Sequence, residues 1–431
     1  MRIGIIGAGN VGTTLGTAFV RAKHEVIYGS RDAGRTAPHS GAMLGSIRGA
    51  VIDGEVVVLA TPFDAVESAL REAGDFEGRV LIDATNPVGP ELSLAVGRTT
   101  SGAERVASLA KNARVVKAFN TTGYDVMANP RFGAHRAVMF VAGDDPDATS
   151  TIATLAADIG FDAIALSGLA CARDLEPLAM VWIQLALQRG LGRNIAFGLA
   201  RRGGGGASAD ATVNLTAHAL RPGSTKKVIT LLGTGNIGGG LARAWLRAGH
   251  DVRLAVRDPM APEVVDLVEH GASVIPVEGA GQATDVLAIA VPAAALAEVM
   301  KRVGDVSGTI IVDCTNGIGP GLTMTAPAGT SSPEQLASLA AGARVVRAFN
   351  QQGAETLRDA KFDDQQAVSF VAGDDDDARQ IVLALSNDIG LDSVDAGPLA
   401  SARMLDHLTL VWLATSKAVG SRELGLTLLR R

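Results

Sequence analysis

The sequence predicts an α/β protein built from two tandem Rossmann-like domains, each a doubly wound parallel sheet followed by a short helical segment. Two observations predict this fold. Short apolar runs bounded by Gly, Pro or Asp alternate with segments of helical periodicity, which is typical of parallel sheets covered on both faces. The motifs of the first half also recur in the second half, and 431 residues are enough for two such domains.

In the first half, apolar runs predict strands and periodic segments predict helices. The expected strands lie at 3–6, 25–28, 56–60, 80–83, 115–118 and 138–141. The expected helices lie at 11–22, 63–73 and 148–159. After Gly168 the pattern turns purely helical, from 174 to about 198, and this apolar segment carries Trp182. We therefore expect the sheet to be complete before Asp174.

The duplication is visible in four pairs of motifs. The pairs are 7–12 (GAGNVG) with 233–238 (GTGNIG), 83–89 (DATNPVG) with 313–319 (DCTNGIG), 114–120 (RVVKAFN) with 344–350 (RVVRAFN), and 140–145 (FVAGDD) with 370–375 (FVAGDD). We call residues 1–202 copy one and residues 227–431 copy two. Residues 203–226 between them begin with four glycines, which favours a flexible tether.

Composition and charge exclude several classes of protein. Hydrophobic residues make up 47% and charged residues 19%, so the chain can bury large cores and is not of the disordered type. Aromatic residues are only 4%, and the net charge of −6 contains no long block of either sign, so nucleic-acid and membrane partners are not expected. Cys171, Cys314 and the scattered His residues predict neither a disulfide framework nor a metal site. Without a signal peptide or an apolar run of ~18 residues, a cytoplasmic protein is expected.

The glycine motif of copy one predicts a dinucleotide site, because it follows a buried strand and opens a helix. Gly7 allows the tight turn, Gly9 lets the backbone approach a pyrophosphate, and Gly12 lets the helix pack close to the strand. The helix N-terminus then offers N–H groups to the phosphates. Copy two repeats the pattern with Gly233, Gly235 and Gly238, although a duplicated domain can keep these glycines for its fold alone.

The end of the second strand favours NADP over NAD. NAD sites usually place an acidic side chain there, to bind the ribose 2′-hydroxyl. Copy one has Ser30 and Arg31, which can bind a 2′-phosphate, although Arg31 could instead pair with Asp32 on the surface. Copy two has Val256 and Arg257 at the matching place, so its preference is less certain.

These motifs together resemble the NADP-dependent oxidoreductases related to coenzyme F-420H2:NADP oxidoreductase. The resemblance covers copy one nearly from end to end and copy two more loosely. It implies that NADP(H) binds to a Rossmann domain and exchanges hydride with a deazaflavin, coenzyme F-420, or with a flavin (FMN or FAD). The residues that it implies for cofactor binding are Asn10 and Val11 at the diphosphate, Ser30 and Arg31 at the 2′-phosphate, Ala60, Thr61 and Pro62 along the nicotinamide ribose, Asn86 and Pro87 at the nicotinamide ring, Asn120, and in copy two Asn236 and Ile237.

Three functions are compatible with the sequence, and it identifies no catalytic residue. The first is hydride exchange between NADP(H) and a deazaflavin or flavin, which needs no acid–base pair because the cofactors carry the chemistry. The second is reduction of a small carbonyl or imine metabolite, for which His135, Tyr124 and Asp174 are candidate proton donors. The third is a non-catalytic sensor of NADP(H).

Two expectations concern the relation of the copies. Segments 174–198 and 406–429 each carry an apolar face with a Trp, so they either pack on the opposite copy as an intrachain pseudo-dimer or cap their own domain. Further homo-oligomerisation is left open. Ser30, Pro87 and the pair at 121–122 are replaced in copy two, so we expect one tight NADP site per chain, in copy one.

Overall fold

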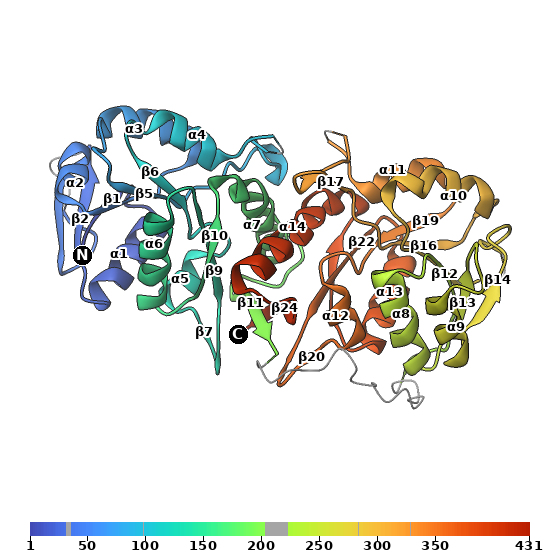
Figure 1. The fold of residues 1–431 in the computed structure, drawn as a ribbon. Helices are drawn as coiled ribbons and strands as arrows, with labels where there is room; N and C mark the ends of the chain where they lie inside the picture. Colours follow the sequence, from blue (N-terminus) through green and yellow to red (C-terminus); the bar gives the residue numbers. More distant parts are fainter. Residues whose placement is uncertain (32–35, 98, 203–222, 283, 328) are drawn as a thin grey trace. The chain divides into compact units, whose positions relative to one another are not determined.

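The computed structural model describes residues 1–31, 36–97, 99–202, 223–282, 284–327 and 329–431. The chain divides into two compact units (Figure 1). One unit holds residues Met1–Leu199, Leu413–Gly420 and Leu428–Arg431, and the other holds Ala200–Trp412 and Ser421–Thr427. Most of the predicted tether, residues 203–222, lies outside the described part of the chain.

Copy one contains an eight-stranded sheet in the order β10-β9-β6-β5-β4-β1-β2-β3. Its strands are β1 (Arg2–Ile6), β2 (Glu25–Ser30), β3 (Ala42–Ser46), β4 (Val56–Leu59), β5 (Val80–Asp83), β6 (Arg114–Lys117), β9 (Val138–Gly143) and β10 (Asp162–Ser167). The chain order reverses between β1 and β4, so the carboxyl ends of these two strands form the crevice where doubly wound sheets bind ligands.

Helices cover both faces of this sheet (Figure 1). On one face lie α1 (Asn10–Arg21), α5 (Tyr124–Ala128) and α6 (Pro146–Asp158), and on the other lie α2 (Ile47–Asp53), α3 (Val66–Ala73) and α4 (Gly102–Leu109). The inner strands are buried almost throughout, since each face packs against helices, whereas the edge strands β3 and β10 are partly exposed. A small hairpin, β7 (Arg131–Phe132) with β8 (His135–Arg136), precedes β9.

Copy two repeats the sheet in the order β14-β13-β12-β15-β16-β19-β22-β23. Its strands are β12 (Val228–Leu232), β13 (Asp251–Ala255), β14 (Ser273–Ile275), β15 (Val286–Ile289), β16 (Ile310–Asp313), β19 (Arg344–Arg347), β22 (Val368–Gly373) and β23 (Asp392–Gly397). Its helices are α8 (Asn236–Arg247), α9 (Pro262–Glu269), α10 (Leu296–Val303), α11 (Ser332–Leu339), α12 (Ala354–Arg358) and α13 (Asp376–Asp388). Two short hairpins pair β17 (Ile318–Gly319) with β18 (Thr323–Met324) and β20 (Lys361–Phe362) with β21 (Gln365–Gln366).

The repeated Phe-Val-Ala-Gly-Asp-Asp motif ends a strand and caps the next helix in both copies. Asp145 accepts a hydrogen bond from the Ala148 backbone N–H at 2.8 Å, and Asp375 accepts one from Ala378 at 2.7 Å. These bonds satisfy one of the free N–H groups at the start of α6 and of α13. The motif therefore recurs for a reason of folding.

The structure confirms the tandem Rossmann-like architecture and corrects two details. In each copy the seventh strand runs antiparallel to its neighbour, β9 against β6 and β22 against β19, so the sheets are not fully parallel. The segments predicted as purely helical are also only partly so. Helices α7 (Ala172–Leu187) and α14 (Ala402–Val419) end early, and the strands β11 (Ile195–Arg201) and β24 (Leu424–Arg430) follow. Glycines at positive φ break each helix, Gly190 and Gly192 after α7 and Gly420 after α14.

The C-terminal residues belong to the core of the first unit. Leu429 is only 7% exposed and packs in the same hydrophobic cluster as the strands of copy one. We therefore expect a fragment of residues 1–205 to expose apolar surface and to self-associate or precipitate. Analytical ultracentrifugation of the fragment measures this. A stable monomer would show that copy one is complete by itself, and the pseudo-dimer stays a prediction until then.

Candidate functional site

The first glycine turn of copy one lies where β1 meets α1. Gly7 has a φ of 107°, and a Cβ at this residue would lie 2.5 Å from the Ala60 carbonyl oxygen. A Cβ on Gly12 would lie 1.9 Å from the Gly7 carbonyl oxygen. Any other residue would force the strand, the turn and the helix apart at these two positions. Gly7 and Gly12 are therefore required by the fold itself.

Gly9 differs from both of its partners. Its φ of −81° is open to any residue, and a Cβ there would meet nothing within 4 Å. Gly9 precedes α1, whose start has no side-chain cap and no acidic residue in its first turn. Backbone N–H groups at such a helix start bind phosphate, and the helix dipole adds to the attraction. The exposed Asn10 and half-buried Val11 open this helix, so the turn fits the diphosphate of a dinucleotide.

A cavity of about 220 Å³ lies at the ends of β1 and β2. The predicted residues that line it are Gly7, Ser30, Arg31 and Thr61. The Arg31 side chain is 61% exposed, and its Nε lies 3.8 Å from a carboxylate oxygen of Glu72 on α3. This loose surface pair leaves the guanidinium available to a phosphate. Asp32, the alternative partner, lies outside the described residues.

Tyr28 supports this cavity and was not predicted as a site residue. Its hydroxyl donates to the Gly12 carbonyl oxygen at 3.1 Å and lies 3.0 Å from Nε2 of His39. Burial raises the pKa of Tyr28 to about 12, so the hydroxyl stays protonated. A Cβ on Gly16 would lie 2.0 Å from this hydroxyl oxygen. In the sequence, the only sign of this contact is that α1 has glycines at 12 and 16, four residues apart on one face of the helix.

At the opposite end of the site, two asparagines that follow β5 and β6 are joined by hydrogen bonds. Asn86 Nδ2 donates to the Asn120 carbonyl oxygen at 2.8 Å, and Asn120 Nδ2 donates to Asn86 Oδ1 at 3.2 Å. Asn120 is 2% exposed, and its Oδ1 is buried without a hydrogen-bond partner, as is Oγ1 of Thr61. A buried acceptor without a donor is costly, by about 1–3 kcal/mol. Pro87 is buried beside these residues in the chain, and Ala60 and Pro62 flank Thr61.

A closed network of buried charges lies beneath this end. The Lys117 Nζ lies 2.9 Å from a carboxylate oxygen of Asp83, 2.9 Å from one of Glu176, and 2.7 Å from the Thr85 carbonyl oxygen. The three charged side chains are at most 1% exposed. Burial alone would lower the pKa of Lys117, but the two carboxylates outweigh it and raise that pKa, so the ammonium persists.

Glu176 links this network to helix α4. Its two carboxylate oxygens accept the backbone N–H groups of Gly102 at 2.8 Å and Ala103 at 3.0 Å, while one of them also contacts Lys117. The network therefore joins β5, β6, α4 and α7 directly below Asn86. Sequence reasoning missed it, although Asp83 and Lys117 stand in motifs that recur in copy two.

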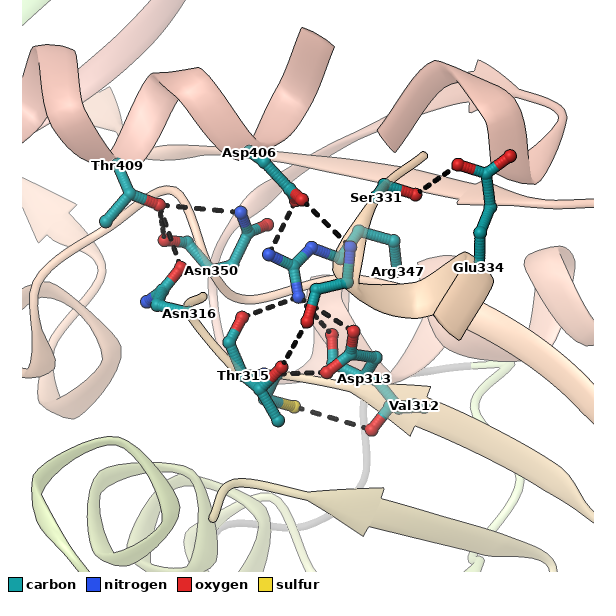
Figure 2. A network of polar contacts seen from close by, with 12 residues as sticks. Val312, Asp313, Thr315, Asn316, Ser331, Glu334, Arg347, Asn350, Asp406 and Thr409 are labelled. Carbon is teal, nitrogen blue, oxygen red and sulfur yellow. Dashed lines mark hydrogen bonds and ion pairs between the residues drawn. The ribbon is translucent and has the colours of Figure 1, made fainter. Parts of the chain in front are cut away.

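Copy two builds the same network from different side chains (Figure 2). Arg347 replaces Lys117 and contacts Asp313 at 3.1 Å and Asp406 at 2.7 Å, and it donates to the Thr315 carbonyl oxygen at 2.6 Å. Asp406 stands in place of Glu176. Arginine is longer than lysine and aspartate is shorter than glutamate, so the two changes compensate and the charged groups stay in contact.

The predicted residues of copy two meet around a cavity of about 550 Å³. Those that line it are Gly233, Gly235, Asn236, Ile237 and Arg257. It also reaches Pro292 and Asn316, which match Pro62 and Asn86. Gly238, like Gly12, lies against its own turn, since a Cβ there would be 1.9 Å from the Gly233 carbonyl oxygen.

Comparison with known proteins agrees with this geometry. A family model described as "NADP oxidoreductase coenzyme F420-dependent" matches residues 2–87 and 228–317, one match in each copy. The F420-dependent NADP reductase of Methanothermobacter thermautotrophicus is 32% identical over 213 residues, which cover 44% of this chain and 90% of that protein. The chain belongs to the family of F420-dependent NADP oxidoreductases. This confirms the resemblance and the tandem duplication.

Two further similarities are a match to part of a longer protein and a match to a solved structure with a low TM-score. Metalloreductase STEAP3 of Rattus norvegicus is 32% identical over 182 residues, which are 42% of this chain and 36% of that protein. The chain thus spans about a third of the metalloreductase that it matches. A solved structure from Arthrobacter sp. FB24 is 31% identical, with a TM-score of 0.42 over 45% of this chain and 96% of that one.

Within the described part of this tandem oxidoreductase-family chain, no helix is both long and apolar enough to cross a bilayer. The three candidate proton donors lie on separate elements. Tyr124 is on α5, where the Arg193 guanidinium stacks 4.4 Å from the centre of its ring. His135 is in the β7–β8 hairpin, and Asp174 is in the first turn of α7. Asp174 directly precedes Leu175, whose carbonyl oxygen accepts a hydrogen bond from Asn120 Nδ2 at 3.1 Å.

Proposed function

We propose that copy one binds NADP(H) and exchanges hydride between its nicotinamide ring and a second ring cofactor, a deazaflavin such as coenzyme F-420 or a flavin. The first turn of α1 beside Gly9 would hold the diphosphate, and Ser30 with Arg31 the 2′-phosphate. Thr61 would lie along the nicotinamide ribose, and Asn86 and Asn120 would face the nicotinamide. When bound, NADP(H) supplies the hydride, and the protein supplies position and a dry environment.

One observation carries this proposal. The titratable side chains beneath the nicotinamide end, Lys117, Asp83 and Glu176, are bound to one another and buried, so none is free to give a proton to a substrate. Reduction of a carbonyl or imine needs such a donor, whereas hydride transfer between two rings does not. The unpartnered Asn120 Oδ1 could accept a hydrogen bond from the amide N–H of the nicotinamide, and this bond would remove the free-energy cost of a buried acceptor without a donor.

The relatives support the choice of acceptor. One of them is named an F420-dependent NADP reductase and matches over 90% of its length, which favours a deazaflavin. A flavin is the second acceptor to be tested, because the sequence resemblance implies either ring cofactor. Metal reduction is not carried over, because the chain covers only 36% of the metalloreductase.

A panel of acceptors tests the proposal. NADPH oxidation is followed anaerobically with coenzyme F-420, FMN, FAD and a set of ketones and imines. We expect turnover with F-420 or with a flavin. Turnover with ketones or imines alone would establish the second function. Tight NADPH binding without turnover on any acceptor would establish a sensor.

Arg31→Ala tests the 2′-phosphate contact. A charge-assisted bond to phosphate contributes about 1.5–3 kcal/mol, so the KM for NADPH should rise at least tenfold. The KM for NADH, which has no 2′-phosphate, should change little. Steady-state kinetics with both nucleotides measure the split. Equal increases for NADPH and NADH would place the 2′-phosphate elsewhere.

A further inference from the structure

We propose that copy two binds a second NADP(H) through Arg257 and Arg302 but takes no part in hydride exchange. This inference rests on the proposed function only in placing that exchange in copy one. Copy two would then be a nucleotide-binding half whose occupancy is independent of the acceptor.

The cavity of copy two has the size and lining for a dinucleotide. Its volume is about 550 Å³, and its wall runs from Arg257 through the turn at Gly235 to Asn316. These positions match the 2′-phosphate, diphosphate and nicotinamide ends of copy one. The uncapped start of α8, with no acidic residue in its first turn, faces the same cavity through Asn236 and Ile237.

Gly235 is the residue that the fold of copy two does not explain. Gly233 and Gly238 are required by contacts of 2.6 Å and 1.9 Å that a Cβ would make with carbonyl oxygens. Gly235 has an ordinary φ of −65°, and a Cβ there would meet nothing within 4 Å. Glycine also costs more conformational entropy on folding than any other residue. A diphosphate that must approach this turn closely would explain why residue 235 is a glycine.

Copy two has Val256 where copy one has Ser30, so it lacks one hydrogen-bond donor for the 2′-phosphate, and Arg302 can replace that donor. It lies on α10 at the position of Glu72 in copy one, and both Arg302 and Arg257 line the cavity. Where copy one pairs Arg31 with Glu72, copy two therefore presents two guanidinium groups. The sequence comparison weighed the replacement of Ser30, Pro87 and the pair at 121–122 but not Arg302, and so it predicted one tight site per chain, in copy one.

Acidic groups around Arg302 do not cancel this arrangement. Arg302 contacts Glu278 at 2.9 Å, but the two side chains are 37% and 64% exposed, and an exposed pair of this kind is easily exchanged for a phosphate. Asp258, Glu263 and Glu298 also line the cavity. They would oppose binding at one end, so the two arginines must provide a measurable part of the affinity.

At the nicotinamide end of copy two, side chains of the protein itself already form the hydrogen bonds to Asn350 and Asn316. Gln351, in place of Thr121, donates to Asn350 Oδ1, the atom that matches the unpartnered Asn120 Oδ1. The Gln351 amide also forms two hydrogen bonds of 3.2 Å with the Phe370 backbone. Thr409 donates to Asn316 Oδ1 at 3.0 Å. The amide of Gln351 thus takes the place that we assign to the nicotinamide amide in copy one.

Calorimetric titration of the full chain with NADPH tests the inference. We expect two binding events in the wild type and one in Gly9→Val, and the milder Gly9→Ala repeats the measurement if the valine variant unfolds. In the Gly9→Val background, Arg302→Glu should weaken NADPH and adenosine 2′,5′-bisphosphate at least tenfold and NADH less than twofold. Lys301→Glu is the control, since it makes the same charge change at the exposed neighbouring residue. It should weaken NADPH less than threefold.

Three results would overturn the inference. The first is a single binding event that Gly9→Val abolishes. The second is an equal loss of affinity in Arg302→Glu and Lys301→Glu. The third is a Gly9→Val protein that still transfers hydride at more than a tenth of the wild-type rate, because copy two would then be active. Failure of the wild type to reduce any ring acceptor would reject the proposed function instead, and it would leave the count of binding events unaffected.

Discussion

Gly9→Val should reduce kcat/KM for NADPH at least 100-fold. The valine side chain fits the fold, because a Cβ at Gly9 meets nothing within 4 Å and the backbone φ is ordinary. It instead occupies the space where the diphosphate approaches the first turn of α1. A 100-fold loss corresponds to about 2.7 kcal/mol of transition-state stabilisation. Steady-state kinetics give the loss, and circular dichroism with a thermal melt shows that the fold is intact.

Gly235→Val is the matched variant in copy two, with the same open surroundings. Gly9→Val should cost at least ten times more turnover than Gly235→Val. Equal losses from the two would indicate two equivalent catalytic halves. A larger loss from Gly235→Val would move the active site to copy two.

Lys117→Met should destabilise copy one by about 3–5 kcal/mol, because it leaves Asp83 and Glu176 buried without a counter-ion. The chain divides into two compact units, so a single global unfolding midpoint does not report on copy one alone. Amide hydrogen exchange of β5 and β6 measures the stability of copy one by itself. Lys111→Met is the matched control, since that lysine pairs with Asp75 at 2.9 Å but is 72% exposed. It should have a far smaller effect.

The second copy suggests a compensating pair of substitutions at Lys117 and Glu176. Lys117→Arg and Glu176→Asp should each be destabilising alone, because each changes the reach of only one ion. The double variant reproduces the pair Arg347 and Asp406 and should recover most of the lost stability. Additive losses in the double variant would show that the two side chains are not matched in length.

The sequence predicts the parts of this molecule that depend on local pattern. The glycine turns, the strands β1, β2, β4, β5, β6 and β9 and the duplication follow from apolar runs and repeated motifs, and the structure confirms them. The strands β3, β7, β8 and β10 were not predicted. The strands β11 and β24 were missed because their apolar residues continue the helical periodicity of α7 and α14. Only the positive φ values of Gly190, Gly192 and Gly420 separate them.

The parts that depend on long-range contacts could not be predicted. Lys117 meets Glu176 across 59 positions of the chain (176 − 117), and although Lys117 stands in a repeated motif, nothing in the sequence identifies Glu176 as its partner. Arg302 and Glu72 are ordinary helix residues until the fold places them beside Arg257 and Arg31. The distinct role of Gly9 and Gly235 also needs the structure, because all three glycines of the motif look alike in the sequence.

Transfer of deuterium from NADPH labelled at C4 of the nicotinamide tests the central claim most directly. In an anaerobic single turnover with the full chain, the label should appear on the ring of reduced F-420 or of the reduced flavin. The Gly9→Val variant should show at least a 100-fold slower transfer. Label found only in the alcohol or amine formed from a ketone or imine would contradict ring-to-ring hydride exchange. Transfer at an undiminished rate in Gly9→Val would contradict its assignment to copy one.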